Sequence, residues 1–156
     1  TEDSGDGGII DISTNNLVIQ GKVRVVNVGI SVGSGGDGNA GKIFAQVRDS
    51  LKLDNGGIAS ISDRSSGGEI SISAGNIRLT GNSDILTLVN SGGSGGNLTL
   101  TADSIVAFDD SDIVAASRDG AGGNISLNTD AFFSNNFNPA LSRGDNVFRN
   151  KAGQAF

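Results

Sequence analysis

The stretch GEISISAGNIRLTGNSDILTLVNSGGSGGNLTLTA, residues 68–102, contains one full repeat of this sequence and the start of the next. Apolar and polar residues alternate in runs such as EISIS and NLTLT, and clusters of Gly, Ser and Asn separate the runs. Alternation with a period of two predicts strands with one buried face, because successive side chains of a strand point to opposite sides. Helices are disfavoured, since the apolar spacing is not three or four and the chain contains 25 Gly.

The same pattern recurs along the chain. Alternating segments follow a Gly at intervals of 33, 27, 28 and 27 residues, and these anchors are Gly8, Gly41, Gly68, Gly96 and Gly123. Each unit adds a second alternating pair, which needs one inserted residue to align in the second unit. A third apolar cluster closes the unit, and we assign it to Val25/Val28, Ile58/Ile61, Ile85/Leu88 and Ile113/Ala116. Repeats of this length indicate a solenoid in which each unit is one coil.

We therefore predict an all-β fold, a right-handed parallel β-helix of about five coils of ~27 residues with three short strands each. A β-sandwich also has alternating strands, but it does not repeat the same apolar columns at one interval. Residues 1–130 are expected to form the coils. Residues 131–156 are expected to form an irregular coil or cap of the same domain, with Phe132 or Phe133 under the last layer, or else the start of further coils.

Composition excludes several function classes. The net charge is −6 and the Lys and Arg residues are scattered, which argues against nucleic acid as a partner. The chain has no His and no Cys, so the usual zinc sites, Ser-His triads and thiol nucleophiles are excluded. No apolar run is long enough for a transmembrane segment, and no signal peptide is visible; a chain that starts at Thr1 is interpreted as a fragment or processed product. We expect no enzyme, no cofactor, and no catalytic or metal-binding residues.

Two candidate calcium sites have simpler interpretations. Asp109, Asp110 and Asp112 lie at one corner of the fourth unit, but the third unit has only Asp84 there, so we expect a solvated acidic turn rather than a stacked Ca²⁺ site. The segment GSGGDGNAG, 33–41, resembles the nonapeptides of calcium β-rolls but occurs once. The first unit is about six residues longer than the others. We place the excess near 29–40 as a surface loop.

Other surface features are also interpreted as structural. The sequons at Asn97 and Asn124 fall inside strands, so the Asn side chains are expected to form hydrogen bonds at the coil corner. Outward Thr and Ser residues of successive units form a polar ladder, for which solvation is favoured over weak glycan contact: Ser71/Ser73, Thr99/Thr101 and Ser126/Asn128. The RGD triplet, 143–145, is a weak indication of receptor binding.

A polysaccharide-degrading or carbohydrate-binding module is the alternative function. Degradation needs a basic residue beside acidic groups in a cleft, whereas Lys52, Arg78 and Arg118 stand alone in the sequence. Binding needs an exposed aromatic platform, for which the candidates are Phe137 and Phe148. Fold by itself does not decide between these functions.

Three segments resemble the coils of filamentous-haemagglutinin-like exoproteins: GNAGKIFAQVRDSLKLDNGG, SSGGEISISAGNIRLTGNSDI and GAGGNISLNTDAFF. The most similar sequences are those of the large members of this family that are common in photosynthetic bacteria. The resemblance covers roughly residues 5–133 and rests on the GG[NE]-I-x-I rhythm at one period. It does not extend to the Asn-Pro-rich secretion module of that family. The chain therefore resembles interior or C-terminal coils.

The resemblance implies two-partner secretion through an outer-membrane partner transporter, which is engaged by the parent protein. It also implies a location on the outer cell surface or in the medium, and a role in adhesion. It supplies no catalytic residues. We expect a structural or adhesive segment of a large secreted bacterial protein, a rigid stalk whose partner is a cell-surface glycan or a matrix component.

Overall fold

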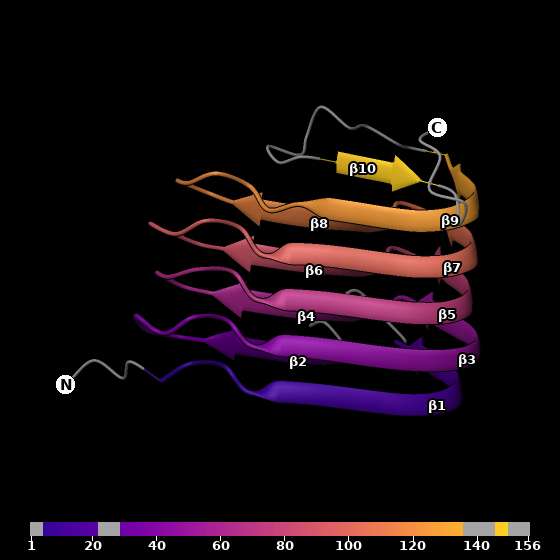
Figure 1. Cartoon of the computed structure of the whole chain (residues 1–156), viewed down its shortest axis with the longest axis horizontal. Coiled ribbons are helices and arrows are strands. Elements are labelled where there is room, and N and C mark those ends of the chain that lie inside the picture. The colour runs from indigo at the N-terminus through magenta and orange to yellow at the C-terminus, as the bar shows by residue number, and fades with distance from the viewer. Residues whose placement is uncertain (1–4, 22–28, 136–145, 150–156) are drawn as a thin grey trace.

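The computed structural model describes residues 5–21, 29–135 and 146–149, and these contain only strands and turns. All strand pairs are parallel, and they form two sheets on opposite sides of one stack (Figure 1). The first sheet has the order β1-β3-β5-β7-β9-β10, with bounds Ile9–Gln20, Lys42–Asp54, Glu69–Thr80, Asn97–Ala107, Ile125–Ser134 and Asn146–Arg149. The second has the order β2-β4-β6-β8, with bounds Gly29–Ser34, Gly57–Ser62, Asp84–Val89 and Asp112–Ser117. The predicted parallel β-helix is confirmed.

Each coil consists of one long strand and one short strand, not of three short strands. The first two strands expected in each unit are a single strand that bends near its middle and stays paired on both sides of the bend, as Figure 1 shows at the right-hand end of the stack. The sequence signals a break there because the alternation changes phase. The backbone turns this corner without losing its pairing. Four complete coils and the long strand of a fifth are formed before β10.

The registers reproduce the spacing of the repeats. Ile72 pairs with Ala45 in the coil before and with Leu100 in the coil after, at differences of 27 and 28 residues. The one-residue insertion expected in the second unit is also present. Between paired positions β3 has two residues, Arg48 and Asp49, where its neighbours have one, which makes a β-bulge at the bend.

The core behind the long strands is a set of aliphatic columns. Its fully buried members are Ile43, Leu51, Leu53, Ile70, Ile72, Ile77, Leu79, Leu98, Leu100 and Ile105. Each side chain packs on its counterpart one coil away, and burial of each contributes roughly 1.5–3 kcal/mol. In the first coil the equivalent residues Ile10, Ile12 and Leu17 are only partly buried.

The interior behind the short strands differs from the prediction. Ile58, Ile85 and Ile113 point inward as expected, but their assigned partners Ile61, Leu88 and Ala116 do not. Strict alternation places inward the residues two and four positions after each Ile: Ser60/Ser62, Thr87/Val89 and Ala115/Ser117. The prediction paired apolar residues three positions apart, whereas side chains on one face of a strand are two positions apart.

The first coil shows the same error and a displaced insertion. Ile30 and Val32 occupy the inward positions there, in register with Ile58 and Ser60, so the assignment to Val25 and Val28 is wrong. Residues 29–34 are the strand β2, not part of a loop. The excess length lies between β1 and β2, at 21–28, and most of it (22–28) lies outside the described residues.

The C-terminal part continues the stack further than expected. β9 stays in register with β7 as far as Ser134, beyond the boundary placed at 131. Phe132 packs against the core, whereas Phe133 is 55% exposed. β10 then pairs in parallel with the first half of β9. The RGD triplet and Phe137 lie outside the described residues, as does the side chain of Phe148.

Candidate binding surface

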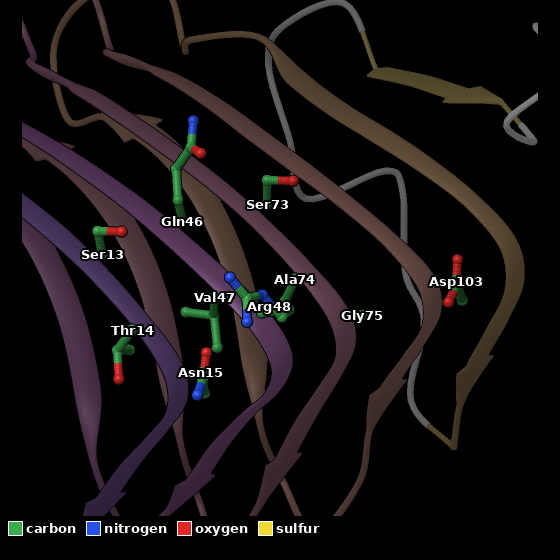
Figure 2. Close-up of a pocket in the computed structure, with 10 residues that line it drawn as sticks. All are labelled: Ser13, Thr14, Asn15, Gln46, Val47, Arg48, Ser73, Ala74, Gly75 and Asp103. Carbon is green, nitrogen blue, oxygen red and sulfur yellow. The ribbon is translucent and has the colours of Figure 1, made fainter.

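A groove of about 600 Å³ crosses the outer side of the bend in the long strands. Ten residues from four successive coils line it: Ser13, Thr14, Asn15, Gln46, Val47, Arg48, Ser73, Ala74, Gly75 and Asp103 (Figure 2). Because β1, β3, β5 and β7 are consecutive neighbours in the sheet, the groove runs along the stack rather than along a strand.

Two local features hollow the groove. The bulge at Arg48–Asp49 adds a residue at the corner of β3, and bulges re-aim side chains. The next coil has Gly75 at this corner, where a Cβ atom would lie 2.4 Å from the Asp49 carbonyl oxygen. Glycine is therefore required beside the bulge. It lets the backbones of the two coils approach closely at this corner.

One wall of the groove is a polar column. Ser13, Gln46 and Ser73 are in register on three successive strands, and Figure 2 shows them side by side along one wall of the groove. Within the described part of the chain, the side chains of these residues, of Asn15 and of Arg48 make no hydrogen bond or ion pair. Hydroxyl, amide and guanidinium groups therefore face the groove with their hydrogen-bonding capacity unused.

The column immediately beyond the bend behaves differently. Ser50 Oγ donates a hydrogen bond of 2.7 Å to Asn16 Oδ1, and Ser104 Oγ donates one of 2.7 Å to Asn76 Oδ1. These bonds link adjacent coils and use the polar groups internally. The column beyond the bend therefore links the coils to one another, whereas the polar groups of the groove are available to a ligand.

The acidic corner has one pair of stacked carboxylates. Asp84 is in register with Asp112, and it is the single acidic counterpart that the sequence placed in the third unit. Burial raises the pKa of the Asp84 carboxyl, and the negative charges of Asp112 and Asp110 raise that pKa further. The backbone N–H of Asp112 donates to Asp84 Oδ1 at 3.2 Å, which opposes the rise in pKa.

The backbone explains why acidic residues occupy this turn. Asp109 and Asp110 have φ angles of 57° and 65°, in the left-handed region that Asn and Asp tolerate better than most residues. Asn55 and Asn82 have the same conformation between the long and short strands of earlier coils. Across the described ranges, no group of three or more His, Cys, Asp or Glu is placed to hold a metal ion.

The remaining sequence candidates are dispersed. Asn97 Oδ1 accepts a hydrogen bond from the backbone N–H of Asn124 at 3.3 Å, which confirms the expected role at the coil corner. Lys52 and Arg78 are in register on adjacent coils, outside the groove. Arg118 lies in the turn after β8. The polar ladder faces outward as expected, and Asn128 Nδ2 donates to Thr101 Oγ1 at 3.4 Å.

Sequence reasoning missed the groove. Gln46 and Arg48 look like isolated polar residues in the sequence, and their common neighbour Gly75 looks like an ordinary turn residue. The insertion in the second unit was the available signal, because an extra residue in an otherwise regular repeat marks a bulge. A single-residue insertion gives no direction for the side chain, so only the structure shows that Arg48 lines a hollow.

Comparisons with protein-family models, with curated proteins and with solved structures found no match. Among the described residues no helix is long and apolar enough to cross a membrane.

Proposed function

We propose that this chain is a structural and adhesive segment of a large secreted bacterial surface protein, in which the coils form a rigid stalk. The observation that carries the proposal is the continuous parallel pairing of the long strands from β1 to β9, with interchangeable aliphatic layers inside. Such a stack extends by adding coils, and each coil contacts only its neighbours. A stalk requires this property, whereas a compact enzyme does not.

The outer surface supports the adhesive part of the proposal. Small polar side chains form columns along the stack, with about 4.8 Å between the members on adjacent coils. Contacts to a partner can therefore repeat from coil to coil. The negative net charge favours a partner other than nucleic acid. Transport through an outer-membrane partner and a location outside the cell belong to this proposal. The repeat motif GG[NE]-I-x-I supports them.

A carbohydrate-binding or polysaccharide-degrading module is the second candidate, and the groove favours its binding form. An open polar channel along the stack suits a sugar chain better than a flat surface does. Degradation has less support. The groove contains one basic and one acidic residue, Arg48 and Asp103, which lie on strands two coils apart.

Binding of the purified chain to intact cells and to a glycan array, with and without Ca²⁺, tests the adhesive part. We expect saturable binding that Ca²⁺ does not change. Failure to bind any cell or glycan would remove adhesion from these coils and leave only the stalk. Release of shortened products from a bound polysaccharide would contradict the proposal and favour the enzyme.

A further inference from the structure

We propose that the groove at the bend binds an extended glycan that lies along the stack, with one terminal carboxylate held by Arg48 and neutral sugars behind it. This inference rests on the adhesive role proposed above and names its ligand class and its site. Its evidence is the groove itself, the unpaired polar groups on its wall and the single cation within it.

The shape selects an extended chain. Lining residues come from four successive coils, so the long direction of the groove spans about three steps of ~4.8 Å. The column Ser13, Gln46 and Ser73 offers one polar side chain at each step. A sugar chain advances along its axis by a similar distance per residue. Each sugar can therefore meet the same kind of group in turn.

The chemistry selects sugars over other extended ligands. The lining contains hydroxyl, amide and guanidinium groups and no aromatic side chain. Stacking of nucleic-acid bases has no platform there, and repeated phosphates would meet one cation on a protein of net charge −6. An added β-strand is excluded as well, because β3 and β5 are paired on both edges.

The charges of Arg48 and Asp103 determine the orientation of the glycan in the groove and the number of carboxylates it can carry. Arg48 is exposed, makes no ion pair within the described residues, and can form a bidentate pair with a carboxylate. Asp103 lines the groove two coils further along. A carboxylate at this position disfavours a second carboxylate on the ligand. A glycan with one carboxylate at its end fits both groups.

The test measures binding of the whole chain by calorimetry to a matched pair of probes. The first is a sialylated pentasaccharide with one terminal carboxylate, and the second is the same glycan without the sialic acid. We expect the pentasaccharide to bind at least about tenfold more tightly than the neutral tetrasaccharide, the size of a lost charged hydrogen bond.

Variants locate the site. Arg48→Gln should weaken the pentasaccharide by the same factor and leave the tetrasaccharide unchanged. Ser73→Tyr should weaken both, because the ring would fill the groove. Two matched controls lie outside the groove: Lys52→Gln removes another outward cation, and Ser126→Tyr adds the same ring to a different column. Both should leave binding unchanged, and circular dichroism should show the same melt for all four variants.

The possible outcomes distinguish the proposed glycan site from the adhesive role on which it rests. Equal affinity for the two probes, or unchanged binding by Arg48→Gln, would overturn the carboxylate assignment. A loss with Lys52→Gln would move the site to the Lys52–Arg78 pair and overturn the groove. Binding to cells that survives both Arg48→Gln and Ser73→Tyr would overturn the groove and keep adhesion. A chain that binds neither probe overturns the groove, and one that also binds no cell overturns adhesion.

Discussion

The two sheets enclose one interior but stabilise it differently. Behind the long strands β3, β5 and β7 the buried side chains are aliphatic, as at Leu51, Ile77 and Ile105, which are in one column and fully buried. Behind the short strands the layers include buried hydroxyl groups, which donate to backbone carbonyl oxygens of the glycine-rich corners. The donors are Ser60 to Gly41 at 2.8 Å, Ser62 to Gly38 at 3.2 Å, Thr87 to Gly96 at 2.9 Å and Ser117 to Gly93 at 2.7 Å.

This difference follows from the shape of the coil. At the glycine corners the backbones of successive coils approach too closely for side chains: a Cβ on Gly68 would lie 1.8 Å from the Gly41 oxygen. Carbonyl groups there face the interior, and a buried carbonyl without a partner is costly. Ser and Thr on the short strands donate hydrogen bonds to these carbonyls. The long strands begin directly after these corners, and the inward positions of β3, β5 and β7 are filled by apolar side chains.

The largest expected effect comes from placing a charge in an aliphatic layer. Ile72→Asp would bury a carboxylate among Ala45, Leu100 and their neighbours, with no cation in reach. We expect a loss of about 4 kcal/mol or more, enough to unfold the central coils. Circular dichroism melts would measure it. Ser71→Asp, one residue away and outward, is the control and should change little; an unchanged melt for Ile72→Asp would refute the column assignment.

The next effect tests the close approach at the corners. Gly68→Ala would place a methyl group against the Gly41 oxygen and Ser60 Oγ, and we expect a loss of about 2–3 kcal/mol. Gly57→Ala is the matched control, since its Cβ would lie 3.4 Å from the nearest atom, the Asp84 oxygen. Urea titrations of both variants give the comparison. Equal stability of the two would show that the corners are not closely packed.

A smaller effect tests the buried hydroxyl groups directly. Thr87→Val keeps the shape but removes the donor to the Gly96 carbonyl, so we expect a loss of about 1–2 kcal/mol. Thr99→Val, on the outer face of β7, should stay within about 0.5 kcal/mol of the parent. The difference between the two in thermal unfolding measures the hydroxyl contribution. A more stable Thr87→Val variant would contradict it.

The smallest effect concerns the acidic corner. The pKa of Asp84 is raised in the folded state, so the folded chain binds this proton more tightly than the unfolded chain does. The unfavourable contribution is therefore present at neutral pH and fades as the pH falls through the raised pKa. Asp84→Asn should raise the melting temperature slightly at pH 7 and reduce its change between pH 7 and pH 4. A lower melting temperature at pH 7 would reverse the assigned sign.

The repeat predicts much of this fold because equivalent positions in most coils have the same types of residue. Gly anchors and the columns at Ile43, Ile70 and Leu98 are visible as spacing, and pairing follows from spacing. The short-strand interior could not be predicted in the same way. Its inward Ser60 and Thr87 look like surface residues until the corner carbonyls they bind are known.

The groove was hidden for a related reason. Its residues belong to four different repeats, and Arg48 lies at a bulge whose close approach to the next coil requires Gly75. Spacing along the chain reveals which residues are stacked. It does not reveal where a bulge directs a side chain, because that depends on the backbone of the neighbouring coil.

The parallel stacking of the coils is tested most directly by the pattern of backbone NOEs in an isotope-labelled sample. Stacked parallel coils predict contacts between residues whose numbers differ by a constant 27 or 28: Ala45 with Ile72, Ile72 with Leu100, and Leu100 with Leu127. Contacts between pairs whose residue numbers have a constant sum would mean antiparallel strands, and that result would contradict the stacked coils and every assignment built on them.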